Sequence, residues 1–215
     1  MTRPYHFPEL PFEEIPAGKS VLVTGPGRLA SRLGRRMVLE RASEEGSLVV
    51  TTNTTGKALA ADTASAYPDS DMSRLGIIDA TGRAETSTDT DARIRSVSNT
   101  GDLTGVSINF SVLSSALNEA GVDRLRSCFD SLSLFLMYTK FQTITRFTHT
   151  LCGRVSATDG FGVFVLDSSM HDPQVEYTLK SICDERIEVR REAQRYEYRT
   201  EGLSHYPSEW TPFDL

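Results

Sequence analysis

The chain has 215 residues and a formal net charge of −6, and 39% of its residues are hydrophobic. That length is enough for one domain with a sizeable core. The acidic balance disfavours a nucleic-acid surface, because neutralising phosphates requires a basic stripe. The three cysteines are odd in number and widely spaced, which argues against a disulfide framework or a zinc cluster.

No apolar run approaches the length of a membrane span, and the first residues lack the apolar core of a signal peptide. We therefore expect a cytoplasmic protein without membrane contact. The first 18 residues contain four prolines, which predicts an extended arm over residues 1–17. Four apolar side chains can fasten this arm to its own domain or to a neighbouring subunit: Phe7, Leu10, Phe12 and Ile15.

The main domain is predicted to span residues 18–203, where strands and helices alternate, followed by a tail over 204–215. Strands are expected at 20–24, 47–52, 75–79, 124–129 and 161–166. Helices are expected at 29–45, 53–67, 102–120, 141–155 and 173–183. A polar stretch at 81–100 predicts a mobile surface loop with a short extended piece near 94–97, and 186–190 with 196–200 predicts a hairpin. This alternation indicates an α/β fold with a mainly parallel sheet.

The stretch from Ser20 to Leu33 places a glycine-containing loop between an apolar strand and an amphipathic helix. Such a layout points backbone N–H groups and a helix N-terminus at an anion, usually a phosphate. The candidate nucleotide-binding residues are Gly25, Pro26, Gly27, Arg28, Ala30, Ser31 and Arg32.

Two nucleotide-binding motifs begin in this way, and the loop matches neither fully. A P-loop requires Gly, Lys and Ser or Thr where this chain has Ala30, Ser31 and Arg32. A dinucleotide fingerprint is satisfied by Gly25, Gly27 and Ala30, but the second strand ends without the acidic residue that would bind a ribose. A third interpretation is a turn that only links strand to helix.

A buried strand ending in Asp130-Ser131-Leu132-Ser133, between two amphipathic helices, resembles the Walker B region of RecA/KaiC-like ATPases. The resemblance covers about residues 17–203 and is closest to single-domain KaiC-like proteins of haloarchaea, in agreement with only four lysines among 23 basic residues. It implies a RecA-like three-layer sandwich, a mainly parallel sheet flanked by helices, with a C-terminal antiparallel hairpin. It also implies that Asp130 occupies the position of the aspartate that holds magnesium. Its alternative role is to cap the next helix. Asp167, at the end of the neighbouring strand, is a cap, a turn residue or a rim of the same site.

The departures from this family concern catalysis. The P-loop lysine neutralises the β- and γ-phosphates and the next hydroxyl ligates magnesium, whereas the aligned residues here are Ser31 and Arg32. A pair of glutamates follows the second strand in active relatives, whereas this chain has Thr52-Asn53-Thr54. Neither threonine nor asparagine acts as a general base at neutral pH.

The sequence therefore predicts a pseudo-ATPase with degenerate Walker motifs. It would act as a regulatory or scaffold subunit, in contact with itself, an active RecA/KaiC-like paralogue or a signalling protein, and would require no cofactor. One alternative is a switch that binds ATP or GTP with magnesium and hydrolyses it slowly, using Arg28 or Arg32 as counter-charge. A second alternative is an NAD(P)-binding enzyme of the Rossmann type.

Overall fold

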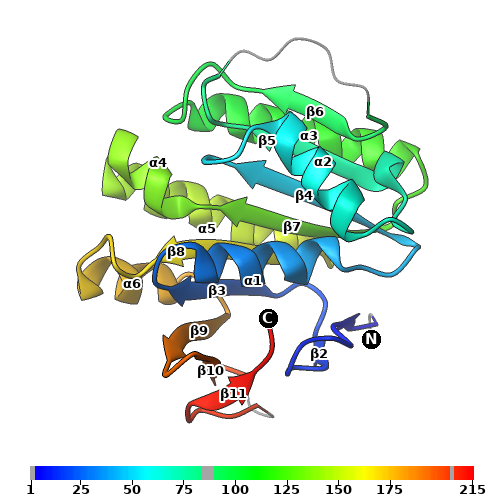
Figure 1. Cartoon of the computed structure of the whole chain (residues 1–215). Coiled ribbons are helices and arrows are strands. Elements are labelled where there is room, and N and C mark those ends of the chain that lie inside the picture. Colours follow the sequence, from blue (N-terminus) through cyan, green and yellow to red (C-terminus); the bar gives the residue numbers. More distant parts are fainter. Residues whose placement is uncertain (1–2, 84–89, 204–205) are drawn as a thin grey trace.

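The computed structural model describes residues 3–83, 90–203 and 206–215. Within them, the central sheet has nine strands in the order β11-β10-β9-β3-β8-β7-β4-β5-β6 (Figure 1). In that order the strands span Thr211–Phe213, Arg195–Glu201, Glu185–Glu192, Ser20–Gly25, Phe161–Asp167, Arg124–Asp130, Glu45–Thr51, Leu75–Asp79 and Arg93–Ser96.

Strands β9, β3, β8, β7, β4, β5 and β6 run parallel, and β10 and β11 continue the sheet antiparallel, so the predicted C-terminal hairpin is confirmed. Strand β3 leads into the loop Gly25-Pro26-Gly27, which we call the glycine loop. This strand lies between β9 and β8, and β8 and β7 separate it from the next long strand, β4. In a dinucleotide-binding fold the first two strands are neighbours. The strand order therefore does not support the Rossmann alternative.

Helices cover both faces of the sheet, as predicted (Figure 1). One face carries α1 (Arg28–Leu39) and α2 (Gly56–Ala66), and the other carries α3 (Leu103–Glu119), α4 (Leu132–Tyr138), α5 (Phe141–Ala157) and α6 (Pro173–Lys180). Each face has its own buried cluster of aliphatic and aromatic side chains, so the sheet is hydrophobic on both sides. A 3-10 turn, Met72–Arg74, precedes β5.

The N-terminal arm folds back on the α1 side of the sheet. Tyr5–His6 (β1) pairs antiparallel with Glu14–Ile15 (β2), and the side chains of Phe7, Leu10 and Phe12 are buried in the same core cluster as α1, as is that of Ile15. The arm thus packs on its own chain.

The first helix is shorter than predicted, because α1 ends at Leu39 and β4 already begins at Glu45. The Arg126 guanidinium, only 1% exposed, donates to the backbone oxygens of Met37 and Glu40 and pairs with the Glu45 carboxylate at 2.6 Å. These bonds satisfy carbonyls that would otherwise be unpaired at a helix end. Arg126 thus stabilises the end of α1 at this point, and no local sequence pattern predicts that end.

Other differences are at short elements. The sequence did not predict α4, whose seven residues are too few to show a helical period, nor β11 in the C-terminal tail. Asp102 caps the N-terminus of α3, since its Oδ1 accepts a hydrogen bond from the backbone N–H of Gly105 at 2.8 Å. Strand β6 is the extended piece expected inside the stretch 81–100, whereas residues 84–89 of that predicted loop and residues 204–205 of the tail lie outside the described residues.

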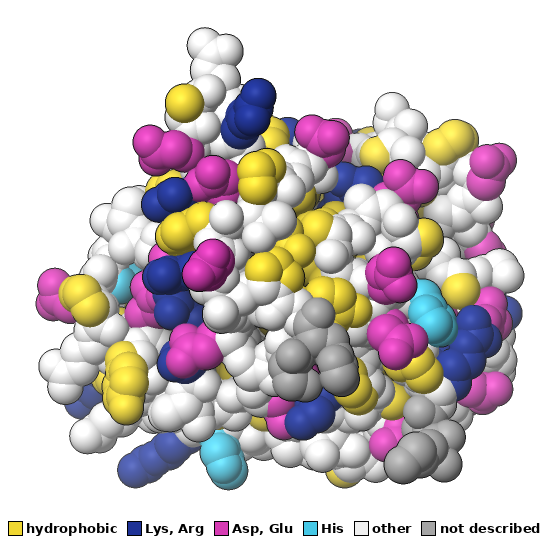
Figure 2. Space-filling view, turned by 90° about the horizontal axis from the view of Figure 1, so that it is seen from below, with side chains coloured by type: hydrophobic (Ala, Val, Ile, Leu, Met, Phe, Trp, Pro, Cys, Tyr) yellow, Lys and Arg dark blue, Asp and Glu magenta, His cyan; other side chains and the backbone are white. Residues whose placement is uncertain are grey.

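The face formed by the hairpin and the arm mixes charges of both signs (Figure 2). On the hairpin, Arg190 pairs with Glu197 at 2.7 Å and Arg199 pairs with Glu188 at 2.5 Å, and Arg186 also contacts Glu188. These arginines are compensated on their own sheet. None of the helices in the described ranges is long and apolar enough to cross a membrane.

Candidate functional site

The glycine loop lies where several parallel strands end. It links the carboxyl end of β3 to α1, beside Asp167 at the end of β8, and the neighbouring strands β7 and β4 end at Asp130 and Thr51. In open α/β sheets this edge is the one that binds ligands. The fold therefore brings the predicted loop and the predicted metal residue to the same edge.

Two glycines of the loop have defined backbone roles. A Cβ atom on Gly25 would lie 2.6 Å from both the side chain and the backbone oxygen of Val189, so β9 can approach only a glycine there. Gly27 has a φ of 58°, in the region that L side chains rarely adopt, and is the N-cap of α1. Both glycines shape a tight strand-to-helix turn.

The backbone N–H of Gly27 is already used inside the chain. It donates to Asp167 Oδ1 at 3.0 Å, and the same oxygen accepts from the backbone N–H and the hydroxyl of Ser169 at 3.0 and 2.6 Å. A carboxylate oxygen thus stands where the oxygen of a bound phosphate would accept from such a loop. Among the three roles expected for Asp167, these bonds show that of a turn residue, and its carboxylate also holds the glycine loop in place.

Asp130 lies at the centre of the site and is 0% exposed. Its Oδ1 accepts from the Ser31 hydroxyl at 2.5 Å, and its Oδ2 accepts from Arg35 Nε at 2.5 Å. The N-cap of α4 is the next residue, Ser131, so the carboxylate of Asp130 is directed to α1 and does not cap that helix. Each carboxylate oxygen therefore has a partner on α1.

Arg35 connects two strand ends. Besides Asp130, its Nη2 donates to Asn53 Oδ1 at 2.9 Å and to Thr54 Oγ1 at 3.2 Å, directly after β4. The hydroxyl and backbone N–H of Thr52 donate to the backbone oxygen of Asp130. The residues at the end of β4 thus hold Asp130 and Arg35 in place.

Arg35 belongs to the candidate site, although the sequence did not predict it. It follows Ser31 by four residues, and that spacing puts the two side chains on one face of α1. Only the sheet topology shows that this face meets Asp130. The Arg35 guanidinium places a positive charge beside Asp130. The aspartate at the corresponding position of RecA/KaiC-like ATPases binds magnesium.

The other predicted loop residues divide into buried and exposed groups. Ala30 is buried in the core, Ser31 is partly buried, and Pro26, Arg28 and Arg32 are exposed. Arg32, which the motif alignment places at the magnesium-binding hydroxyl, points away from Asp130 and donates through Nη2 to the backbone oxygen of Leu215 at 2.6 Å. It is Ser31, aligned with the missing lysine, whose hydroxyl meets Asp130.

The groups that would meet a magnesium-bound nucleotide are engaged with one another in this arrangement. Asp130 is paired with a guanidinium, the Gly27 N–H is paired with a carboxylate, and the motif's lysine is replaced. Among the described residues, no group of three or more His, Cys, Asp or Glu side chains could hold a metal ion. The arrangement links α1 to the ends of β7, β4 and β8.

Together, the strand order and the position of the loop place the chain in the class of RecA-like folds. Among solved structures, it is similar to the crystal structure of a KaiC-like protein from the hyperthermophilic archaeon Pyrococcus horikoshii OT3, with a TM-score of 0.63 and 14% sequence identity, covering 94% of this chain and 87% of that one. The chain belongs to the Family of unknown function (DUF7504), whose model matches residues 18–189. The search of curated proteins found no match.

Proposed function

We propose that this chain is a RecA/KaiC-like pseudo-ATPase that acts by contact, as a regulatory or scaffold subunit. Its partner would be a second copy, an active RecA/KaiC-like paralogue or a signalling protein, and it would need no cofactor. The resemblance noted in the sequence supports a haloarchaeal source and a cytoplasmic location for this role.

One observation supports the proposal above the others: residues at the positions of a magnesium and phosphate site bind one another. Arg35 pairs with Asp130, and Asp167 accepts from the Gly27 N–H. A ligand would have to break both contacts, and no lysine in the loop would offset that cost. The residues after β4 offer amides and hydroxyls, which do not deprotonate water at neutral pH.

The test is a steady-state assay of magnesium-dependent ATP hydrolysis. We expect the purified chain and its Asp130→Ala variant to show the same background rate. A rate well above background in the natural chain that disappears in Asp130→Ala would overturn the proposal. A sample of an active RecA-like ATPase under the same salt conditions is the positive control.

The nucleotide-binding switch remains a second candidate, favoured by the exposed Arg28 and Arg32 beside the loop. In this alternative the chain binds ATP or GTP with magnesium and does not hydrolyse it rapidly. Titration of the natural chain, Arg28→Ala and Arg32→Ala with each nucleotide tests it. Weaker binding by either variant would support the switch, and unchanged or absent binding would dismiss it.

A further inference from the structure

A groove of about 730 Å³ runs between α1 and α2, beside the glycine loop. The α1 wall follows one helical face, and the α2 wall adds apolar surface. The lining residues that the argument uses are Arg28, Arg32, Arg36, Leu39, Leu59 and Tyr67. The groove therefore combines basic side chains with an apolar floor.

The charge of the groove is opposite to that of the molecule. Four arginines and a single acidic side chain, Asp62, are among its lining residues, although the chain as a whole carries −6. Arg35 is paired with Asp130, and Arg36 pairs with Glu40 at 2.8 Å. Among the described residues, no Asp or Glu side chain pairs with Arg28 or Arg32, and Arg32 instead donates to an oxygen of Leu215, so the groove favours an acidic occupant.

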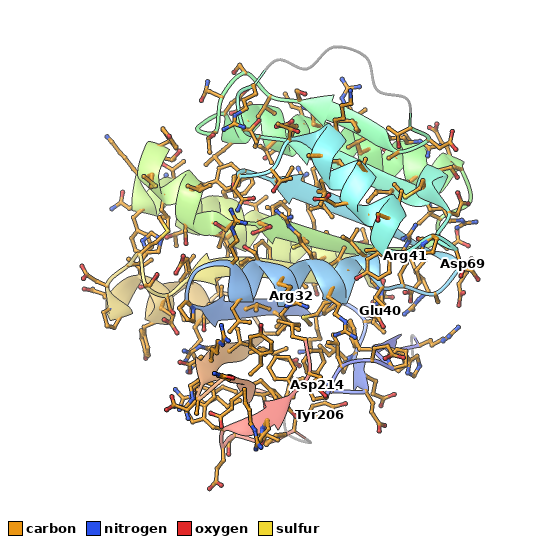
Figure 3. The ribbon with its side chains drawn as sticks, viewed as in Figure 1. Arg32, Glu40, Arg41, Asp69, Tyr206 and Asp214 are labelled. Carbon is orange, nitrogen blue, oxygen red and sulfur yellow. The ribbon has the colours of Figure 1, made fainter. Side chains whose placement is uncertain are left out.

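One residue of the chain's own C-terminal segment lies in this groove. The C-terminal segment leaves β11 and approaches α1 (Figure 1), and Leu215 lines the groove. The backbone oxygen of Leu215 accepts from Arg32, and its side chain packs against the core cluster on the α1 side. Asp214, the acidic residue before it, is exposed on the same segment, below Arg32 in the view of Figure 3.

We propose that the groove is a docking site for an acidic peptide segment of a partner protein that ends in an apolar side chain. Leu215 lines one end of it, as the apolar residue of such a segment would. Arginine suits this role, because its planar fork binds carboxylates and backbone oxygens and its stem packs on apolar surface. This inference rests on the proposed function, since it names the surface through which a contact-only subunit would engage its partner.

The probe is a fluorescein-labelled peptide with the sequence of residues 209–215, Glu-Trp-Thr-Pro-Phe-Asp-Leu. Binding is measured by fluorescence anisotropy to the full chain and to its Leu215→Ala variant, which loosens the resident segment. We expect tighter binding to Leu215→Ala, because a tethered competitor acts at an effective concentration of roughly millimolar. The same peptide with Lys in place of Asp214 should bind more weakly.

Two charge reversals in the Leu215→Ala background locate the contact. Arg32→Glu should weaken peptide binding by about tenfold or more, because it places like charges together. Arg146→Glu, at an exposed position of α5 on the opposite face of the sheet, is the matched control and should leave binding unchanged. Unfolding temperatures of all variants confirm that they are folded.

No peptide binding at millimolar concentration, or equal binding by Arg32→Glu and Arg146→Glu, would overturn the inference. Displacement is also tested with inorganic pyrophosphate. Arg32-dependent binding of pyrophosphate without peptide binding would overturn the inference and assign the groove to a small phosphorylated ligand. The ATPase assay compares the natural chain with Asp130→Ala and does not depend on peptide binding, so failure here and failure of the proposed function are distinguishable.

Discussion

Replacing Arg35 by alanine tests whether a guanidinium holds the central carboxylate of the site. The change removes the Nε donor 2.5 Å from Asp130 Oδ2 and leaves a carboxylate that is 0% exposed with the Ser31 hydroxyl as its remaining side-chain partner. Removing one partner of a buried ion pair costs about 3–5 kcal/mol. Because the Arg35 side chain is 20% exposed, water reaches the pair, and we expect a loss near the low end, about 3 kcal/mol.

The assay is equilibrium unfolding in urea at neutral pH, which gives the free energy of unfolding and its dependence on urea concentration. Arg36→Ala is the matched control on the same helix, because its i,i+4 pair with Glu40 is partly exposed and should contribute under about 1 kcal/mol. Adding Asp130→Asn to Arg35→Ala should recover part of the loss, since the buried charge is then gone. An Arg35→Ala variant no less stable than Arg36→Ala would refute the reasoning.

Two further predictions concern stability. Gly34→Ala should destabilise the fold by about 1–3 kcal/mol, because its Cβ would lie 2.6 Å from Val165 Cγ2 and push α1 off the sheet. Gly153→Ala in α5 has open space around its Cβ and should stabilise the fold by about 0.5–1 kcal/mol. Urea unfolding of both variants gives the two changes in free energy, and equal changes would contradict the packing argument. Burial raises the pKa of Glu185 to about 7, so its neutral form stabilises the fold at acid pH and this contribution is lost as the pH rises through 7. Glu185→Gln should therefore be more stable than the natural chain at pH 8, by at most about 3 kcal/mol, and a pH series of unfolding temperatures that stays parallel for the two proteins would contradict the assignment.

Regular local patterns allowed most of the fold to be predicted. The apolar run before Gly25, the helical spacing of the long helices and the alternation of strands and helices all depend on neighbouring residues, and each corresponds to an observed element. The strand that ends at Asp130 was placed to within one residue for the same reason. Resemblance to the RecA/KaiC-like family then gave the layered architecture, which the similarity of folds supports.

The contacts within the site depend on residues far apart in the chain, and no local pattern shows them. Arg35 meets Asp130 across 95 positions, and Arg32 meets Leu215 across 183. The sequence identified the loop and the strand-end carboxylate, but not which basic side chain would turn toward it. Aligning Arg32 with a magnesium-binding hydroxyl used position in a motif, whereas the helix directs Ser31 and Arg35 inward instead.

The most direct test of the account is thermal unfolding of the natural chain with and without millimolar Mg-ATP. A ligand at 100 times its dissociation constant stabilises a native state by roughly 2.7 kcal/mol, which for a chain of this size shifts the midpoint by several degrees. Because the chain's own side chains occupy the loop N–H and Asp130, we predict no shift. A magnesium-dependent rise in the midpoint that is lost in Asp130→Ala would contradict the account.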